Sequence, residues 1–129
     1  MTIDYAARAQ ALVGTRFRPQ GRDAAGLDCI GVVVAVFQIP PDSVRHDYKL
    51  SGEKLSEVRE QLEMRFRRVA RTVLRSGDVM LLSAGARQPH LAVRTARGFV
   101  HAHAGIRRVV ETPGVPQWPL LGVYRKRSQ

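Results

Sequence analysis

The chain is poor in cysteine, in aromatic residues and in long hydrophobic runs, and each shortage narrows what it can be. A single cysteine, Cys29, excludes an intrachain disulfide, so oxidation does not hold the fold together. The longest apolar run, from Ile30 to Phe37, is too short to cross a bilayer and has the length of a core helix. Aromatic residues make up only 6% of the chain, which is too few for a base-stacking platform.

The N-terminal residues lack the pattern of a secretory signal. From Met1 to Tyr5 there is no basic region followed by an apolar one. We therefore expect a protein made in the cytoplasm that stays there or leaves within a larger particle. Its 129 residues predict a single domain, residues 1–129, with a core that needs no disulfide or metal to stabilise it.

Positive charge is in clear excess. Lysine and arginine number 21 against 11 acidic residues, a formal net charge of +10, and most of the cations are arginine. One interpretation is attraction to an acidic polymer, because arginine pairs well with carboxylates and phosphates. The other is solubility alone. Composition does not choose between them, and we predict no nucleic acid as the primary partner.

Helix signals dominate the first half of the sequence. Residues 2–13, with Thr2 as N-cap, and residues 52–72, with apolar positions three and four apart, are predicted helices. Residues 29–37 are a buried segment whose valines suit a helix or a strand equally. Residues 38–50, with Pro40-Pro41, read as an irregular connection.

Short β patterns fill the second half. The predicted strands are Val79–Ser83, His90–Thr95, Gly98–His103, Ile106–Val110 and Leu120–Arg125. The tight connection at Ala96-Arg97 predicts a hairpin between the second and third of them. Helices followed by an antiparallel sheet indicate the α+β class.

Cys29 and two histidines form a candidate catalytic set. Cys29 follows a glycine-punctuated loop and begins the buried segment, where a helix N-terminus would favour a thiolate. His90 opens a strand, and the predicted hairpin brings His101 close to it. His90 is then the candidate base for the thiol, with His101 fixing its tautomer. The oxyanion donor would be the backbone N–H of Cys29.

Other interpretations of the same residues remain open at this point. A lone buried cysteine is usually a small hydrophobe, and histidines in a sheet are often structural. His103 lies on the same strand face as His101 and is an equal candidate for the orienting role. Cys29 with three histidines is also a conceivable zinc set, although we predict neither metal nor cofactor. His46, in a polar loop, is expected to be solvated.

Four motifs in order resemble the NlpC-type family of papain-like cysteine peptidases. They are Gly14-Thr15-Arg16-Phe17-Arg18, Gly26-Leu27-Asp28-Cys29-Ile30-Gly31, Ser76-Gly77-Asp78-Val79, and the pair His90-Leu91-Ala92-Val93 with Gly98-Phe99-Val100-His101-Ala102. The resemblance favours a helix over residues 29–37 and implies N-terminal helices packed on a central antiparallel sheet. It also implies that Cys29 is the nucleophile, His90 the base and His101 the orienting group.

The resemblance implies a substrate as well. Family members cleave γ-D-glutamyl–diaminopimelate or similar bonds in bacterial wall peptides, so the peptidoglycan stem peptide is the implied substrate. Asp28, Phe17 and Arg22 are the implied substrate-side residues, although Asp28 is also a candidate helix cap. Phe17 stands where the family has tyrosine, and Ile30 where it has serine.

The "LDCIG" variant and the closing Gly122-Val123-Tyr124-Arg125 resemble the branch found with phage tails and gene-transfer particles. That branch implies a virion-borne enzyme at the tail tip, in contact with tail-tip or hub proteins. The alternative is a tail-tip assembly module that keeps the peptidase fold with little or no activity. Independently of this choice, residues 38–72 are longer than the family's usual connection, and we expect them to cover the cleft or bind a partner.

Overall fold

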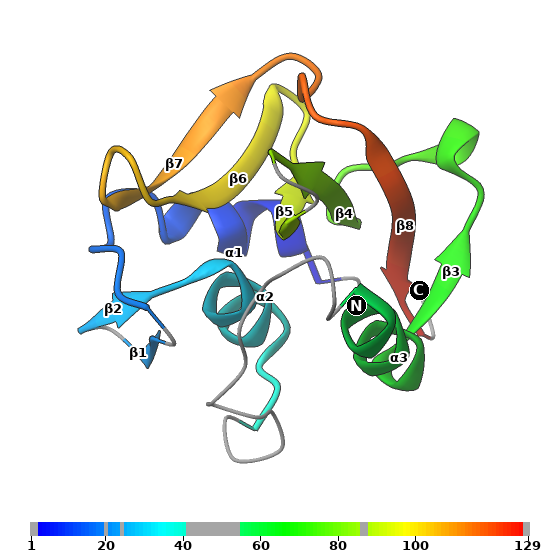
Figure 1. The fold of residues 1–129 in the computed structure, drawn as a ribbon, viewed down its shortest axis with the longest axis horizontal. Helices are drawn as coiled ribbons and strands as arrows, with labels where there is room; N and C mark the ends of the chain where they lie inside the picture. Colours follow the sequence, from blue (N-terminus) through cyan, green and yellow to red (C-terminus); the bar gives the residue numbers. More distant parts are fainter. Residues whose placement is uncertain (1–2, 20, 24, 41–54, 86–87, 128–129) are drawn as a thin grey trace.

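The computed structural model describes residues 3–19, 21–23, 25–40, 55–85 and 88–127. Within these ranges, three α-helices lie on one side of a six-stranded antiparallel sheet (Figure 1). The helices are α1 (Tyr5–Ala11), α2 (Cys29–Phe37) and α3 (Leu55–Arg65). The predicted α+β arrangement, with helices packed on a central antiparallel sheet, is confirmed. Within the described ranges, no helix has the length and apolar character needed to span a membrane.

The sheet follows the order β3-β8-β4-β5-β6-β7. Its strands are β3 (Phe66–Val69), β4 (Val79–Ala84), β5 (Gln88–Arg94), β6 (Gly98–His103), β7 (Arg108–Pro113) and β8 (Leu120–Lys126). A short ladder of β1 (Arg22–Asp23) and β2 (Gly26–Leu27) precedes α2, and a 3₁₀ turn, η3 (Arg71–Val73), follows β3. The hairpin predicted at Ala96-Arg97 joins β5 to β6 and is confirmed.

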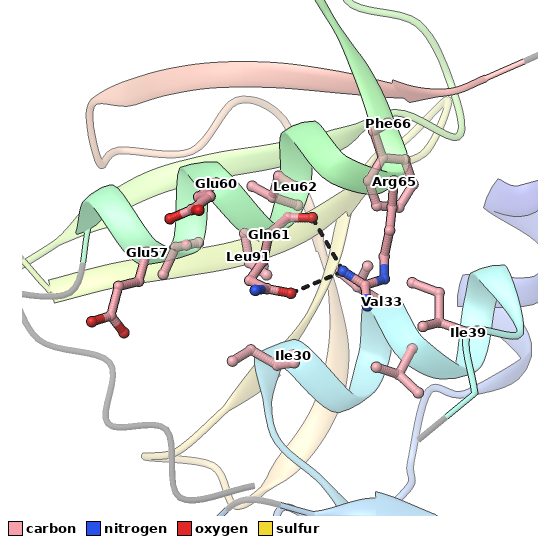
Figure 2. Close-up of a pocket in the computed structure, with 12 residues that line it drawn as sticks. Ile30, Val33, Ile39, Glu57, Glu60, Gln61, Leu62, Arg65, Phe66 and Leu91 are labelled. Carbon is pink, nitrogen blue, oxygen red and sulfur yellow. Dashed lines mark hydrogen bonds between the residues drawn. The ribbon is translucent and has the colours of Figure 1, made fainter. Parts of the chain in front are cut away.

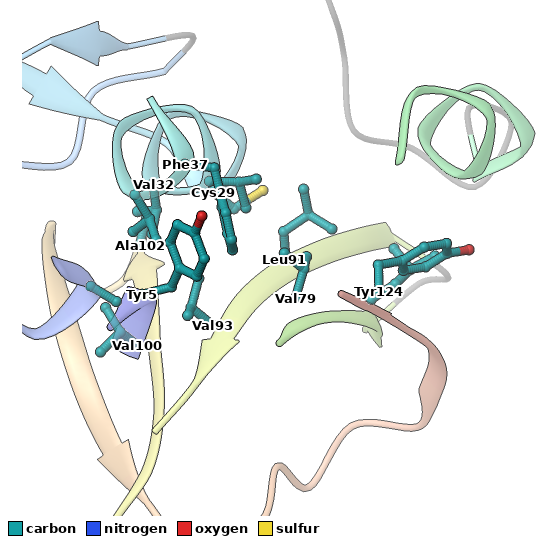
Figure 3. Packing of buried hydrophobic residues seen from close by; sticks show 14 of the residues in the cluster. Tyr5, Cys29, Val32, Phe37, Val79, Leu91, Val93, Val100, Ala102 and Tyr124 are labelled. Atoms are coloured by element: carbon teal, nitrogen blue, oxygen red, sulfur yellow. The ribbon is translucent and has the colours of Figure 1, made fainter. Parts of the chain in front are cut away.

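The main core lies between the helices and the sheet. Val32 of α2 and Val93 of β5 are both fully buried there, and Cys29 belongs to the same cluster (Figure 3). The ring of Phe37 packs 4.5 Å from that of Tyr5 and 4.9 Å, edge-on, from that of Phe66. Each such buried side chain contributes about 1.5–3 kcal/mol to folding. A smaller cluster on the opposite face of the sheet joins Met80, Leu82, Ala92 and Phe99.

Helix α2 has the predicted limits, residues 29–37. Its N-cap, Asp28, and its burial between α1 and the sheet outweigh the β preference of its valines. Helix α1 is shorter than predicted: it begins at Tyr5, with Asp4 as N-cap, and ends at Ala11. The predicted N-cap Thr2 lies outside the described residues.

The predicted helix over residues 52–72 is wrong beyond Arg65. Helix α3 ends at Arg65, and Phe66–Val69 forms an edge strand paired with β8, while residues 52–54 lie outside the described residues. The spacing of Leu62 and Phe66 continues the helical pattern, but Phe66 is buried from a strand. Pairing with β8 gives hydrogen-bond partners to backbone N–H and C=O groups that an open sheet edge would leave unpaired. Because this pairing joins segments far apart in the sequence, the local spacing of apolar residues does not predict it.

The strand predicted at Ile106–Val110 is displaced along the chain. The strand β7 begins at Arg108, because residues 104–107 form a turn in which the backbone N–H of Arg107 donates to the carbonyl of His103 at 2.7 Å. Arg107 has a left-handed φ of 66°. The sequence carries no glycine or asparagine at that position to signal such a turn.

Candidate active site

The start of α2 fixes the position of Cys29. The carboxylate of Asp28 accepts a hydrogen bond from the backbone N–H of Gly31 at 2.7 Å and so caps the helix. A side chain at Gly31 would collide with the carbonyl oxygen of Gly21, which explains the glycine two residues after the cysteine. Cys29 therefore lies in the first helical turn, where N–H groups and the helix dipole favour negative charge on sulfur.

The sheet opens where the two histidines lie. Strands β5 and β6 pair at Val93–Val100 and Arg94–Phe99, and no further ladder pair joins them, although the structure describes every residue of both. His90 lies near the start of β5 and His101 near the end of β6, on the diverging side of this ladder. Helix α2 packs against both strands, so its first residue comes to the same opening.

The two histidines are in direct contact, as the hairpin predicts. Nε2 of His90 lies 2.8 Å from Nδ1 of His101, and Nε2 of His101 lies 3.0 Å from the hydroxyl oxygen of Thr112 on β7. Among the described residues, Nδ1 of His90 has no hydrogen-bond partner. If that nitrogen is to accept a proton, Nε2 of His90 must carry its hydrogen and donate it to His101. His101 then donates from its own Nε2 to Thr112.

The surroundings hold both imidazoles in their neutral form. Burial, with a smaller contribution from His103, lowers the pKa of His90 from 6.5 to about 4. Burial, with smaller contributions from His90 and His103, lowers the pKa of His101 to about 3. The indole of Trp118 packs edge-on against His90, with ring centroids 5.1 Å apart, and shields this side of the pair. At neutral pH, His90 is an uncharged base.

The thiol and both imidazoles line one cleft of about 530 Å³. Its walls come from the loop before α2, from β5, from the end of β6 and from the β7–β8 loop. Lining residues include Phe17, Pro19, Asp28, Cys29, Gln88, His90, His101, His103 and Trp118. Cys29 is only 3% exposed, so it lies at the boundary between the hydrophobic core and the cleft. The arrangement can deliver a nucleophile and a base to the same bond.

The other predicted site residues lie in different places. Phe17 lines the cleft, and Asp28 lines it while one of its oxygens caps α2. The side chain of Arg22 lies outside the described residues, as does His46. His103 lines the cleft but accepts a hydrogen bond from the backbone N–H of Ile106 at 3.1 Å, which leaves the contact with His90 to His101. No group of three or more possible metal ligands occurs among the described residues.

The sequence reasoning misses two residues of the site: Trp118, which lines the cleft, and Thr112, which contacts His101. Trp118 is the only tryptophan and lies between Pro116 and Pro119, a signal of a fixed loop that carries an aromatic side chain. Thr112 gives no signal at all, because its role depends on the pairing of β6 with β7. A side chain at Gly98 would collide with the carbonyl of Thr112, so this glycine permits the close approach of the two strands.

A second hollow, of about 280 Å³, lies between α2 and α3 (Figure 2). Ile30, which stands where the family has serine, lines this hollow and is not among the residues that line the catalytic cleft. In Figure 2, Arg65 donates to the side-chain oxygen of Gln61 at 2.9 Å. We predict that residues 38–72 cover the cleft or bind a partner. No described residue of α3 or β3 lines the catalytic cleft. Residues 41–54 of this segment lie outside the described ranges.

Comparison with known proteins agrees with this geometry. No family model matches the chain. The chain is 31% identical over 106 residues to "Murein DD-endopeptidase MepS/Murein LD-carboxypeptidase" of Escherichia coli (strain K12), covering 81% of this chain and 51% of the relative. The chain thus spans about half the length of the curated relatives that it matches.

Solved structures show the same fold at low identity. The P60 domain of antigen MAP1204 from Mycobacterium avium subspecies paratuberculosis superposes with a TM-score of 0.65 at 17% identity, covering 98% of this chain and 93% of that one. RipD from Mycobacterium tuberculosis, described as a non-catalytic NlpC/p60 domain protein, superposes with a TM-score of 0.57 at 14% identity, covering 95% and 94%.

The fold and the meeting of cysteine and histidine in one cleft define a papain-like domain. Within that class the chain has the fold of the solved NlpC/p60 domains, and the resemblance of its four motifs to the NlpC-type family is confirmed.

Proposed function

We propose that this domain is a cysteine peptidase that hydrolyses peptide bonds in the stem peptides of peptidoglycan. One observation carries the proposal: Cys29 at the start of α2 shares a cleft with a neutral His90, whose Nε2 is held by His101. The similarity to a murein endopeptidase supports the choice of substrate.

The proposed mechanism assigns each proton to a stated atom. Nδ1 of His90 takes the proton from the Cys29 thiol while the sulfur attacks the carbonyl carbon of the scissile bond. Negative charge develops on the carbonyl oxygen and is stabilised by the backbone N–H of Cys29 in the first turn of α2. His90 then protonates the departing amine, which leaves a thioester on Cys29. A water molecule, deprotonated by His90, hydrolyses the thioester and restores the thiol.

His101 acts on His90 and not on the substrate. Its Nδ1 accepts the hydrogen of His90 Nε2, which keeps the opposite nitrogen of His90 available as a base. When His90 becomes positively charged during the reaction, the same contact stabilises the charge. We assign the bond between γ-D-glutamate and the diamino acid as the one cleaved, with Asp28, Phe17 and Arg22 on the substrate side.

The experiment uses purified peptidoglycan and a synthetic stem peptide, L-Ala-γ-D-Glu-diaminopimelate-D-Ala, with products identified by mass spectrometry. Cleavage should fall about 10³-fold or more in Cys29→Ala and in His90→Ala. His101→Ala should lose far more activity than His103→Ala, because only His101 contacts His90. Inert wild-type protein, or activity that survives Cys29→Ala, would reject the peptidase.

The alternative function is a non-catalytic module that keeps the fold. It is favoured by the structural similarity to a domain described as non-catalytic and adapted to peptidoglycan binding. Alkylation of Cys29 by iodoacetamide across pH separates the two. A catalytic site predicts labelling that depends on His90, whereas a structural cysteine predicts equal, slow labelling in the wild type and in His90→Ala.

We further propose that the domain is carried on the tail tip of a phage or gene-transfer particle, in contact with tail-tip or hub proteins. The sequence similarity of residues 27–31 and 122–125 to that branch supports the proposal. Purified particles should contain the chain when analysed by mass spectrometry, and an antibody against it should label the tail end. Particles that lack the chain would reject this location. In an assembly module, Cys29→Ala would leave particle infectivity unchanged.

A further inference from the structure

A further hollow, lined by positively charged residues, adjoins the catalytic cleft. It has a volume of about 430 Å³ and is lined by Arg16, Phe17, Ile106, Arg107 and Arg108. Phe17 lines both this hollow and the catalytic cleft. The mechanism described above uses none of the three arginines.

Backbone hydrogen bonds on two sides fix the segment that carries Arg16. The carbonyl of Arg16 accepts a hydrogen bond from the N–H of Leu27 at 2.9 Å, two residues before Cys29. On the other side, the N–H of Phe17 donates to the carbonyl of Arg107 at 3.0 Å. The segment that carries Arg16 is thus tied to the start of α2 and to the turn after His103.

Arg107 occupies an unusual backbone conformation. Its φ of 66° lies in the left-handed region, which side chains other than glycine, asparagine and aspartate rarely adopt. The hydrogen bond from its N–H to the carbonyl of His103, at 2.7 Å, holds the turn. The same turn therefore carries a residue of the catalytic cleft, His103, and a residue of the charged hollow, Arg107.

The three guanidinium groups have no anionic partner within the described part of the chain. Arg108 donates to the carbonyl of Gly14 at 3.3 Å, and the side chains of Arg16 and Arg107 have no hydrogen bond to a described residue. All three residues are exposed. Three like charges around one hollow repel one another, and an anion between them relieves that repulsion.

We infer that this hollow binds the C-terminal carboxylate of the same peptide whose scissile bond lies at Cys29. The planar fork of a guanidinium matches a carboxylate with two parallel hydrogen bonds. Stem peptides end in a carboxylate and carry others along their length, and Phe17 provides the apolar wall between the reacting bond and the charge. This inference rests on the proposed function, because it places a peptide in the cleft.

The test compares two forms of one peptide. The stem tetrapeptide L-Ala-γ-D-Glu-diaminopimelate-D-Ala is prepared with a C-terminal carboxylate and with a C-terminal carboxamide, and binding is measured by calorimetry. The protein carries Cys29→Ala, which prevents turnover. The free acid should bind about tenfold more tightly than the amide, a difference typical of one charged hydrogen-bonded contact.

Variants assign the preference to the hollow. In Arg16→Gln/Arg107→Gln the free acid and the amide should bind with the same affinity, whereas the control Arg68→Gln, an exposed arginine of β3, should keep the tenfold difference. Circular dichroism melting checks that the variants are folded. Equal binding of acid and amide by the parent protein, or a preference that survives the double variant, would overturn the inference.

Two further outcomes distinguish the binding of a carboxylate in this hollow from the proposed peptidase function. A carboxylate preference that depends on the arginines, in a protein whose wild type cleaves no wall peptide, supports the charged subsite and rejects the peptidase. A short single-stranded DNA that binds more tightly than the free-acid peptide, and loses that affinity in the double variant, assigns the hollow to phosphates and overturns the carboxylate.

Discussion

Thr112 on β7 holds His101 on β6 through its hydroxyl oxygen, which lies 3.0 Å from Nε2 of His101. The contact is made two residues along from the ladder pair His101–Val110. When Nδ1 of His101 accepts from His90, Nε2 of His101 carries the hydrogen and donates it to this oxygen, so the contact supports that tautomer. Thr112 is therefore a positioning residue that acts through two imidazoles and does not touch the substrate.

The first prediction concerns this hydroxyl. Thr112→Val keeps the shape of the side chain but removes the contact, so kcat/KM for the stem peptide should fall about threefold to tenfold with KM unchanged. Thr112→Ser, which restores a hydroxyl, should recover most of the loss. Steady-state kinetics measure both variants. Wild-type kinetics in Thr112→Val would show that the His90–His101 contact alone fixes the tautomer.

The second prediction is the acidic limb of the pH–rate profile. Because burial lowers the pKa of His90 to about 4, the free enzyme keeps a neutral base well below pH 6.5. The value of kcat/KM should therefore change little between pH 7 and pH 5.5 and decline as pH approaches 4. In Trp118→Ala, which admits water beside His90, the limb should move toward pH 6.5. A wild-type limb centred near pH 6.5 would contradict the shielding of His90.

The third prediction concerns stability and the same two histidines. Their folded pKa values lie below the unfolded value of about 6.5, so between about pH 4 and pH 6.5 the unfolded chain binds more protons. The free energy of unfolding should therefore fall on acidification through that window, by on the order of 1–2 kcal/mol per histidine at pH 5 relative to pH 8.

Urea denaturation at the two pH values measures this loss. The double variant His90→Gln/His101→Gln removes both titrating groups, so its stability should depend much less on pH than that of the wild type. Comparing the two proteins cancels the titration of carboxylates that both share. An identical pH dependence in wild type and double variant would show that the two imidazoles do not change their protonation on folding.

Features that depend on local signals in the sequence are predicted correctly, whereas features that depend on contacts between distant segments are not. The limits of α2 and the contact between His90 and His101 depend on local signals: an Asp before the helix and a tight hairpin between two strands. The end of α3 depends on whether Phe66 can pair with a strand some 60 residues later, which helical spacing does not reveal. The role of Thr112 arises only when β7 pairs with β6, and the arginine hollow arises only when the turn between these strands meets the segment that carries Arg16.

Asp78 and Arg125 give the last prediction, which concerns the fold and not the cleft. Nε and Nη2 of Arg125 donate to the two carboxylate oxygens of Asp78 at 2.7 Å each, and the Asp78 side chain is 2% exposed. This contact raises the pKa of Arg125 and joins the start of β4 to β8. Asp78 also accepts from the backbone N–H of Arg75 at 2.8 Å, which shapes the turn before β4.

Removing one partner leaves the other buried without its counter-charge. Asp78→Asn should therefore reduce the free energy of unfolding by about 3 kcal/mol and Tm by roughly 10 °C, measured by urea and thermal denaturation. Arg125→Met should cost a similar amount, and the double variant should lose less than the sum of the two, because it leaves no unpaired charge. At a temperature where each variant is folded, kcat/KM should match the wild type, since neither residue lines the cleft. Additive losses in the double variant would show that the two side chains stabilise the fold independently.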